Sequence, residues 1–388
     1  MYEPEITKDI INVGVDDRRI EKFENQYELP DGMAYNSYLI LDRKTALFDS
    51  VDIRFKDEWL NNISSELNGR KVDYFIIQHM EPDHSSSIVE FMKANPDTVI
   101  VGNAKTFAML DQFFEDVPAN VRQTVKAGDT LELGTHVLNF VFAPMVHWPE
   151  VMMTYDSTEK VLFSADAFGK FGANDVEDPE GWACEAARYY IGIVGKYGTQ
   201  VQNVLKKAAA LDIKTICALH GPVLTGDLST YLDLYNKWSS YEPDKNGVAI
   251  AYTSVYGHTK AAALSLAEQL KAKGVKIEVF DLARDDMAEA VEAAFRFDRL
   301  VLATTTYNAD IFPFMRHFVE HLTERNFQKR RVAIIENGSW APTAKKVILG
   351  LLEGCKDLTI AENCVTIKSA LNAETRETLA KLAEEFAC

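Results

Sequence analysis

The sequence predicts an α/β protein of two domains, in which a mixed α/β domain precedes a doubly wound parallel sheet. The chain has 388 residues, more than one hydrophobic core usually organises. Its 47% hydrophobic and 26% charged residues are typical of an ordinary globular protein. The two halves also differ in how strands and helices alternate, and this difference indicates two separate folds.

The first half carries short β-rich runs that end in polar loops. Between residues 35 and 219 these runs are NSYLILD, TALFDS, DYFIIQ, TVIVG, VLNFVFAP, KVLFSAD and TICAL. Helical stretches such as 201–211 lie between some of them, and several strands end at a His, Asp or Glu. The pattern predicts a mixed α/β domain over residues 1–245 with a site at the strand ends.

The second half alternates regularly between apolar strands and amphipathic helices. It starts from a cluster of Pro, Asp, Asn and Gly at 241–247, where we place the domain boundary. The strands are VAIAYTS, KIEVFDL, RLVLATTTY, RVAIIENGS and ENCVTI, and the helices lie near 259–273, 286–295, 313–325, 342–354 and 373–386. Five such units predict a flavodoxin-like doubly wound sheet over residues 246–388.

Charge and composition exclude several classes of function. A net charge of −17 would repel nucleic acid and anionic membranes, whereas a small basic redox protein would suit such a surface. The five cysteines form no C-x-x-C pair, which excludes an internal rubredoxin or ferredoxin module and fits reduced thiols. The apolar runs are far shorter than the roughly 18 to 20 residues of a membrane span, and the start MYEPEITKDI lacks a signal-peptide core. We therefore expect a cytoplasmic protein.

A dense group of potential metal ligands follows the strand DYFIIQ. His79, Glu81, Asp83 and His84 fall within six positions. The alternate spacing of 79, 81 and 83 would place three side chains on one side of an extended segment, and His84 could reach a second ion. A single His is more often structural, whereas four ligand types at one strand end indicate a metal site.

Three further strand ends supply what a two-metal site still lacks. They are His147 after VLNFVFAPMV, Asp166 after KVLFSA and His220 after TICAL. Taken singly, Asp166 could cap a helix and His220 could be a buried hydrogen-bonding histidine. As an ordered set the seven residues predict a dinuclear centre, and oxygen ligands with imidazole but no thiolate suit iron or manganese better than structural zinc. Three other histidines lack this strand-end context, and we assign them to the surface or to packing: His136, His317 and His321.

Three loops of the second half have the composition of a flavin site. The first opens a helix with hydroxyls and backbone N–H groups that could hold a phosphate, and a plain Ser/Thr helix cap is the competing interpretation. The other two carry a Tyr or a Trp that could wall a flavin ring or be ordinary half-exposed aromatics. The carboxyl ends of parallel strands meet at one edge, so the loops should converge. The predicted cofactor-binding residues are Thr253, Ser254, Val255, Tyr256, Gly257, His258 and Thr259, then Thr305, Thr306, Tyr307, Asn308 and Ala309, and finally Asn337, Gly338, Ser339 and Trp340.

The motif H-x-E-x-D-H, followed by separate His, Asp and His residues, resembles the diiron domain of flavodiiron proteins, a branch of the metallo-β-lactamase fold. The likeness extends to NSYLI at 36–40 and HWPE at 147–150. It implies an N-terminal αββα sandwich, FMN as the flavin and two iron ions. Metallo-β-lactamase hydrolases instead read H-x-H-x-D-H. By this resemblance one iron is held by His79, Glu81 and His147, the other by Asp83, His84 and His220, and Asp166 bridges the two.

The same resemblance implies an activity, namely reduction of dioxygen to water, of nitric oxide to nitrous oxide, or of both, as detoxification. A rubredoxin-like or other electron donor and a head-to-tail homodimer or dimer of dimers are implied as well. Tyr27, Tyr189 and Tyr190 are candidates for proton delivery, with packing as their alternative role. Two other functions stay open: a dinuclear zinc hydrolase fused to a flavodoxin domain, and a non-catalytic flavin electron carrier or gas sensor.

Overall fold

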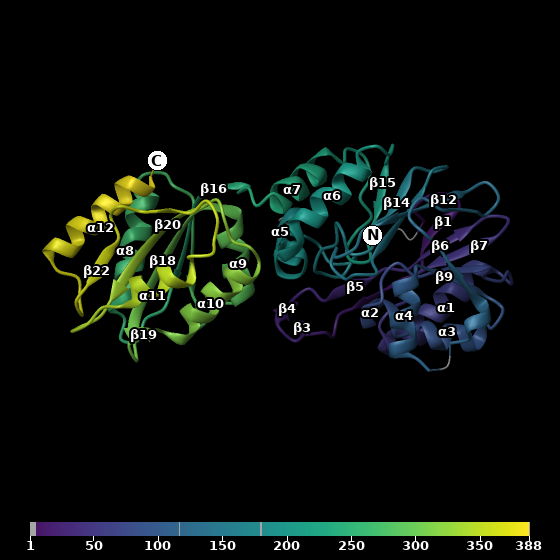
Figure 1. Ribbon diagram of the computed structural model, residues 1–388, viewed down its shortest axis with the longest axis horizontal. Coiled ribbons are helices and arrows are strands. Elements are labelled where there is room, and N and C mark those ends of the chain that lie inside the picture. The colour runs from purple at the N-terminus through teal and green to yellow at the C-terminus, as the bar shows by residue number, and fades with distance from the viewer. Residues whose placement is uncertain (1–4, 116, 179–180, 388) are drawn as a thin grey trace. The chain divides into compact units, whose positions relative to one another are not determined.

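The computed structural model describes residues 5–115, 117–178 and 181–387 and divides into two compact units. Unit 1 comprises Met1–Tyr190 and Thr199–Asn236, and unit 2 comprises Ile191–Gly198 and Lys237–Cys388 (Figure 1). The compact second unit thus begins before the boundary at 245/246 that the sequence indicates, and that boundary remains a prediction. Among the described residues no helix is long and apolar enough to cross a membrane.

Unit 1 is built on two sheets. The first has the strand order β1-β6-β7-β8-β9-β10 and the second the order β11-β12-β13-β14-β15. The first sheet's bounds are β1 Ile10–Asn12, β6 Tyr38–Leu41, β7 Thr45–Phe48, β8 Tyr74–Ile76, β9 Val99–Gly102 and β10 Arg122–Thr124. Those of the second are β11 Thr130–Glu132, β12 Val137–Phe142, β13 Met152–Asp156, β14 Val161–Phe163 and β15 Thr215–Cys217.

The two sheets share one hydrophobic core. Phe48 of β7 stacks on Phe163 of β14 with ring centroids 4.1 Å apart, and Ile40, Leu138 and Phe140 belong to the same buried cluster. Such a sandwich buries the inner faces of both sheets, and β7, whose other face is covered as well, is buried along its whole length. The sandwich predicted for the first half is confirmed.

Helices and two small two-stranded sheets complete unit 1. α4 begins with a capping box in which Asn103 and Thr106 satisfy each other's backbone N–H groups. One of these sheets pairs β2 Val15–Asp17 with β5 Met33–Tyr35, and the other is the hairpin of β3 Lys22–Phe23 and β4 Tyr27–Glu28. The helices are α1 Lys56–Leu67, α2 Pro82–Ser85, α3 Ile88–Ala94, α4 Ala104–Phe113, α5 Trp182–Tyr189, α6 Gly198–Ala208 and α7 Ser229–Ser239, with short turns at Ile53–Phe55 and Ala119–Val121. Two further turns, Tyr190–Val194 and Gly195–Tyr197, lie almost wholly in the segment Ile191–Gly198 of unit 2.

Unit 2 is a parallel sheet in the order β17-β16-β18-β20, continued by β21 and β22, which both pair with β20. This is the flavodoxin-like order 2-1-3-4-5. The strands are β16 Lys245–Tyr252, β17 Ile277–Asp281, β18 Phe297–Tyr307, β20 Arg331–Asn337, β21 Thr359–Ile360 and β22 Val365–Ile367, and β19 Asp310–Ile311 adds an antiparallel pair to β18. The doubly wound sheet predicted from the sequence is confirmed.

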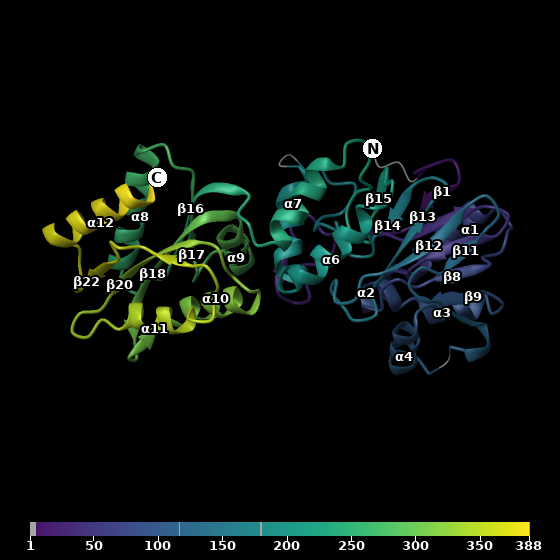
Figure 2. The ribbon, with the colours of Figure 1, turned by 45° about the horizontal axis from the view of Figure 1, so that its top comes forward.

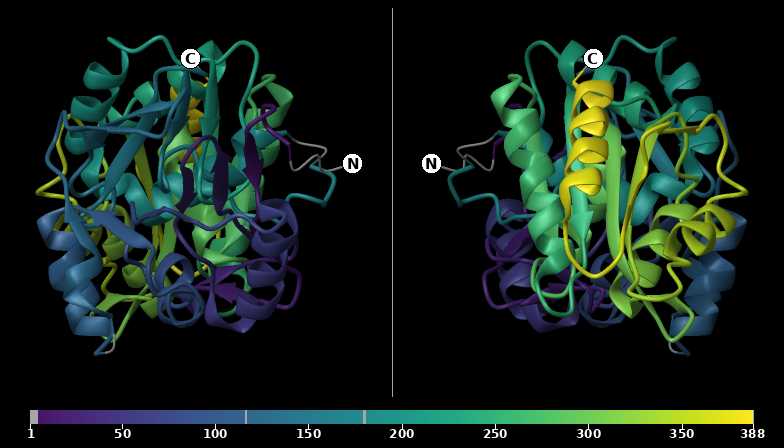
Figure 3. Two further views of the ribbon diagram at one scale, coloured as in Figure 1. Left: turned by 90° about the vertical axis from the view of Figure 1, so that its right-hand side faces the viewer. Right: turned by 90° about the vertical axis from the view of Figure 1, so that its left-hand side faces the viewer.

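Helices cover both faces of this sheet (Figure 2). α8 and α12 lie side by side on one face, where Leu266 and Leu379 join the buried core, and α9, α10 and α11 cover the other (Figure 3). Their bounds are α8 His258–Ala272, α9 Met287–Arg296, α10 Pro313–Glu324, α11 Ala344–Leu351 and α12 Ala373–Phe386. The four described cysteines, Cys184, Cys217, Cys355 and Cys364, are free thiols, and Cys388 lies outside the described residues.

Candidate metal centre and cofactor cavity

The seven predicted metal ligands of unit 1 gather into two adjacent clusters. In the first, His79, Glu81, His147 and Asp166 each offer a ligand atom within 4.8 Å of the others. Nε2 of His147 lies 3.0 Å from Oε2 of Glu81 and 3.2 Å from Oδ2 of Asp166. Nε2 of His79 lies 3.2 and 3.3 Å from the same two oxygens. Two imidazoles and two carboxylates therefore converge on one point.

The second cluster consists of Asp83, His84 and His220. The two Nε2 atoms of His84 and His220 are 3.0 Å apart. Oδ2 of Asp83 lies 3.3 Å from Nε2 of His84 and 3.4 Å from Nε2 of His220. These three atoms form the corners of a small triangle.

Asp166 joins the two clusters through its separate oxygens. Oδ2 faces His79 and His147, whereas Oδ1 lies 3.3 Å from Nε2 of His84 and 3.8 Å from Nε2 of His220. A carboxylate whose two oxygens point into neighbouring clusters has the geometry of a bridge.

The chain brings these side chains together because each follows a strand. His147 comes after β12, Asp166 after β14 and His220 after β15, so three strands of the second sheet contribute one residue each. The loop after β8 supplies the others. We expected Asp83 on the same side as His79 and Glu81, and this expectation is wrong: α2 starts at Pro82, which favours a first helical turn, and the turn carries Asp83 toward His84.

The donor set fits metal ions. Separations of 3.0 to 3.4 Å are the edges expected around an ion about 2.1 Å from each ligand. Within the described residues both oxygens of Asp83 and Oδ1 of Asp166 are buried without a hydrogen bond. Such orphaned acceptors are costly unless a cation satisfies them.

Electrostatics lead to the same conclusion. Burial would lower the pKa of His147, but the carboxylates of Asp166 and Glu81 raise it to about 9. Burial would likewise raise the pKa of Glu81, yet its bonds to His147 and His79 hold that pKa well below its usual range. The cluster therefore demands positive charge, which two divalent ions supply.

Residues around the clusters fix the orientation of the ligand side chains. His79 Nδ1 is 2.8 Å from Oε1 of Glu150, and His220 Nδ1 is 2.8 Å from the carbonyl oxygen of Ala34. In the neutral imidazoles both Nδ1–H groups then donate outward, which leaves each Nε2 lone pair for a metal. Asn36 donates to the carbonyls of Ala218 and Gly221 at 2.8 and 2.7 Å and so holds the loop that carries His220.

The buried Asp49 orients the loop after β8. Its Oδ1 accepts hydrogen bonds from the backbone N–H groups of Gln78 and His79 at 2.8 and 3.1 Å, and burial raises its pKa to about 6. Sequence reasoning missed both Asp49 and Glu150 as site residues. The available signal was their position: Asp49 ends the strand TALFD, and Glu150 closes HWPE next to His147.

Aromatic rings enclose the second cluster. Phe23, Tyr35 and Tyr189 have ring centroids 5.7, 6.0 and 5.4 Å from that of His220. The buried Tyr189 hydroxyl makes no hydrogen bond within the described residues. The ring of Tyr189 contacts the cluster residue His220, whereas Tyr27 packs on Phe171 and Tyr190 on Tyr235.

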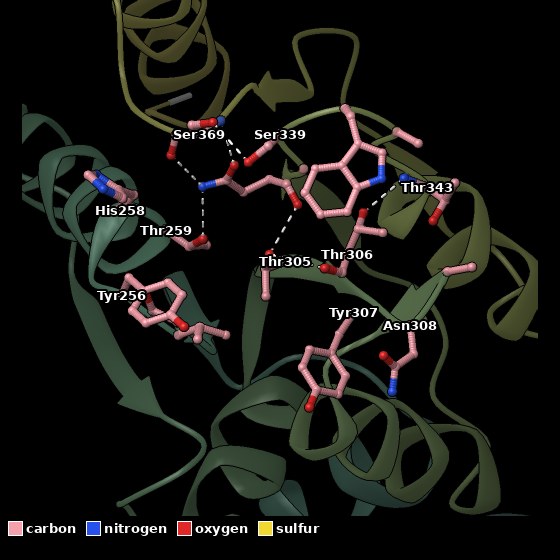
Figure 4. Close-up of a pocket in the computed structure, with 17 residues that line it drawn as sticks. Tyr256, His258, Thr259, Thr305, Thr306, Tyr307, Asn308, Ser339, Thr343 and Ser369 are labelled. Atoms are coloured by element: carbon pink, nitrogen blue, oxygen red, sulfur yellow. Dashed lines mark hydrogen bonds between the residues drawn. The ribbon is translucent and has the colours of Figure 1, made fainter.

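Unit 2 contains a cavity of about 550 Å³ at the carboxyl ends of its strands. Residues of all three predicted loops surround it: Tyr256, His258 and Thr259 after β16, Thr305 to Asn308 at the end of β18, and Ser339 after β20 (Figure 4). Tyr256 and Trp340 are 90% and 93% exposed, which is unusual for such large apolar side chains. A planar aromatic ligand would cover them.

Hydrogen bonds tie the loops together. Asn337 donates to the hydroxyl of Thr259 at 3.3 Å and to the carbonyl of Ser369 at 3.0 Å, while the Thr306 hydroxyl accepts from the backbone N–H of Thr343 at 2.9 Å (Figure 4). Two predicted residues do not line the cavity. Thr253 is buried against Thr304 with its hydroxyls 2.7 Å apart, and Gly257, at φ +88°, precedes α8.

Sequence reasoning missed Thr343 and Ser369, which also line the cavity. Ser369 follows β22, so the rule that strand ends meet at one edge could have found it. The three histidines assigned to surface or packing lie outside both clusters. His136 is buried against Asp156 at 2.7 Å, and the rings of His317 and His321 contact each other on α10.

Comparisons with known proteins agree with both units. Residues 33–221 match the model of the ODP family beta lactamase, and residues 249–373 match that of the flavodoxin domain. An anaerobic nitric oxide reductase flavorubredoxin of Salmonella paratyphi B is 31% identical over 85% of this chain, which spans 71% of that protein.

Two solved structures have the same fold. The rubredoxin oxygen:oxidoreductase of Desulfovibrio gigas superimposes with a TM-score of 0.89 at 26% identity, over 99% of this chain and 97% of that one. The flavodiiron protein of Giardia intestinalis reaches 0.92 at 24% identity, over 100% and 96%, which supports the fold. The chain therefore belongs to the flavodiiron protein family.

Proposed function

We propose that this protein reduces dioxygen to water, nitric oxide to nitrous oxide, or both, at a diiron centre that receives electrons from FMN. The chain is an oxidoreductase by its family, and its cofactors are FMN and a diiron centre. The observation that carries the proposal is Asp166, whose two oxygens join a cluster of four potential ligands to a cluster of three.

The geometry of the two clusters supports the proposed ligands. His79, Glu81 and His147 would hold one iron, Asp83, His84 and His220 the other, and Asp166 both. Bound iron supplies the reversible change of oxidation state that electron transfer to a small oxidant requires. The carboxylates balance the positive charge of the two ions, and Glu150 and the Ala34 carbonyl keep each imidazole turned with Nε2 inward.

The surroundings of the metal centre suit a small apolar oxidant. The rings of Phe23, Tyr35 and Tyr189 place apolar surface around His220. Dioxygen and nitric oxide need no polar recognition, whereas a thioester or phosphodiester substrate of a hydrolase would. This contrast favours the oxidoreductase over the zinc hydrolase that the sequence left open.

The cavity of unit 2 is the proposed FMN site. The helix α8 begins at His258, where unpaired backbone N–H groups favour a phosphate, and Tyr256, Tyr307 and Trp340 would flank the flavin ring. We propose a rubredoxin-like electron donor, a cytoplasmic location and a head-to-tail dimer as parts of the same hypothesis.

The test combines metal analysis with turnover. Purified protein should contain about two irons and one FMN per chain, by the proposed ligand sets. Under reducing conditions it should consume oxygen or nitric oxide for many equivalents per site. Zinc in place of iron, together with thioester or phosphodiester hydrolysis, would establish the hydrolase. Consumption that stops at one equivalent would indicate a carrier or sensor.

A further inference from the structure

The loop that carries His220 turns three of its carbonyl groups toward Asn36. The backbone N–H of Asn36 donates to the carbonyl of Leu219 at 2.8 Å. Its side-chain Nδ2 donates to the carbonyls of Ala218 and Gly221 at 2.8 and 2.7 Å. One buried residue thereby holds the backbone on both sides of a proposed metal ligand.

Two further amides fix the orientation of the Asn36 side chain. Its Oδ1 accepts hydrogen bonds from Nδ2 of Asn12 and Nδ2 of Asn174, each at 2.9 Å. Oδ1 of Asn12 in turn accepts from the backbone N–H of Gly14 at 2.8 Å, which fixes the direction of the Asn12 amide. The Asn36 side chain therefore uses both of its donor hydrogens and accepts two hydrogen bonds. A buried side chain that is satisfied in this way is held rigidly.

Close packing restricts the His220 loop elsewhere. A Cβ atom at Gly169 would lie 3.3 Å from Cβ of His220, and one at Gly221 would lie 2.5 Å from Cγ of Lys170. This packing blocks movement toward Gly169 and Lys170. A loop released from Asn36 would therefore shift toward the space that a smaller residue leaves at position 36.

The position of His220 decides whether the second cluster can close on an ion. Its Nδ1 lies 2.8 Å from the carbonyl oxygen of Ala34, two residues before Asn36. Its Nε2 lies 3.0 Å from Nε2 of His84 and 3.4 Å from Oδ2 of Asp83. Residues 34 and 36 thus orient the ring and the backbone of the same ligand. Because a metal site works only when its ligands are held to within about 0.5 Å, a shift of this loop should weaken binding.

The first cluster depends on a different supporting residue. Within the described residues, the hydrogen bonds of Asn36 end at the His220 loop and at two other asparagines, and none reaches a residue of the first cluster. His79 of that cluster is instead oriented by Glu150, whose Oε1 lies 2.8 Å from its Nδ1.

We propose that Asn36 is a positioning residue of the second cluster, and that its side-chain amide sets the affinity of the second metal ion without setting that of the first. The inference rests on the proposed function, which assigns the two clusters to two ions. The amide carries no charge, so its effect is on geometry and is shared by any divalent ion that accepts these ligands. Co²⁺ can therefore replace Fe²⁺ as the probe.

The test compares Asn36→Ser with Asn174→Ser and with the exposed control Asn61→Ser on α1. Metal-free protein that retains FMN is titrated with Co²⁺. We expect the affinity of one ion to fall by about 10- to 100-fold in Asn36→Ser, because the amide that bonds to both carbonyls is removed. Asn174→Ser removes one of the bonds that fix the Asn36 amide, so it should cause a smaller loss of the same ion. Asn61→Ser should cause none, and FMN content should be unchanged in all three.

A double variant shows which ion is lost. Glu150→Gln removes the orienting partner of His79 in the first cluster. Asn36→Ser combined with Glu150→Gln should therefore weaken both ions, whereas each single variant retains one. Excess Fe²⁺ should restore turnover of Asn36→Ser, because all seven proposed ligands remain in the chain.

Several outcomes would overturn the inference. They are unchanged affinities in Asn36→Ser, an equal loss in Asn61→Ser, or equal weakening of both ions, which would indicate a merely structural role. If Asn36→Ser does not fold, Asn174→Ser decides, and full retention of both ions in that variant refutes the inference. A fully loaded unmodified protein that consumes neither gas would refute the proposed function alone, since the Co²⁺ titration does not depend on turnover.

Discussion

Oε1 of Glu150 lies 2.8 Å from Nδ1 of His79 and 2.9 Å from the backbone nitrogen of Met80. One buried carboxylate thereby fixes both the ring of a proposed ligand and the backbone beside it. Sequence motifs draw attention to the ligand, but the orientation of its lone pair depends on this second residue.

Glu150→Gln should therefore weaken metal binding in the first cluster. The neutral amide is a poorer partner for the Nδ1–H group, so we expect a loss of about 10- to 100-fold in affinity for one of the two ions. Titration of metal-free protein with Fe²⁺ or Co²⁺ measures it. The exposed variant Glu159→Gln serves as control, and equal affinities in the two variants would contradict the orienting role.

Glu81→His should lower the iron content and the reduction of oxidant while FMN remains bound. The change removes an anionic oxygen ligand from the first cluster only, and the cofactor cavity lies in the other compact unit. Iron and flavin are measured on the same preparation. Simultaneous loss of flavin would disprove the independence of the two sites.

Trp340→Ala should weaken FMN by about tenfold, because stacking of aromatic rings contributes roughly 0.5–1.5 kcal/mol. The side chain is 93% exposed, so the free energy of unfolding of the flavin-free protein should not change. Quenching of flavin fluorescence measures the affinity. The affinity for riboflavin should fall as much as the affinity for FMN, because Trp340 contacts the flavin ring that both share. A fall in the affinity for FMN alone would instead place Trp340 at the phosphate.

His321 should make the protein less stable as the pH falls from about 6.5 to about 4. Burial and then the charge of Arg325 lower the pKa of His321 to about 4, and Arg325 Nη1 lies 3.0 Å from its Nδ1. The unfolded chain therefore binds a proton in this window that the folded chain refuses, and folding stability drops. Denaturant unfolding across this range should show a smaller pH dependence in His321→Gln, and an identical dependence would exclude His321 as its source.

The head-to-tail arrangement predicts complementation between two inactive variants. Asp83→Ala disables the metals, and a Ser254/Thr259 double alanine, which alters two residues that line the cavity, disables FMN. A mixed dimer should recover about half the activity of the unmodified dimer. It keeps one working pair, in which the FMN of one subunit faces the diiron centre of the other subunit across the interface. An inactive mixed dimer with both remaining cofactors bound would place electron transfer within a single chain.

Much of the site could be predicted because the chemistry sits at strand ends. His147, Asp166 and His220 each close an apolar run, and a run of that kind is visible in a sequence. The grouping of Asp83 was not visible in the same way, since it depends on a helical turn that starts at Pro82. The residue pattern alone suggested the extended alternative.

Other site residues could not be predicted, because a single hydrogen bond or contact leaves no periodic pattern in the sequence. Asp49 acts through backbone N–H groups, and Ser369 reaches the cavity through its main chain and one hydroxyl. Pattern reasoning locates strands and ligand types, whereas such partnerships need coordinates.

A carboxylate shared by two clusters also links the filling of one to the filling of the other. The first ion bound would hold Asp166 in one rotamer, and the carboxylate oxygen for the second ion would then already be in place. The conformational entropy of the Asp166 side chain is lost only in the first binding step, so the two binding steps are thermodynamically coupled. Metal uptake should accordingly be cooperative, with empty and doubly loaded chains outnumbering chains that carry a single ion.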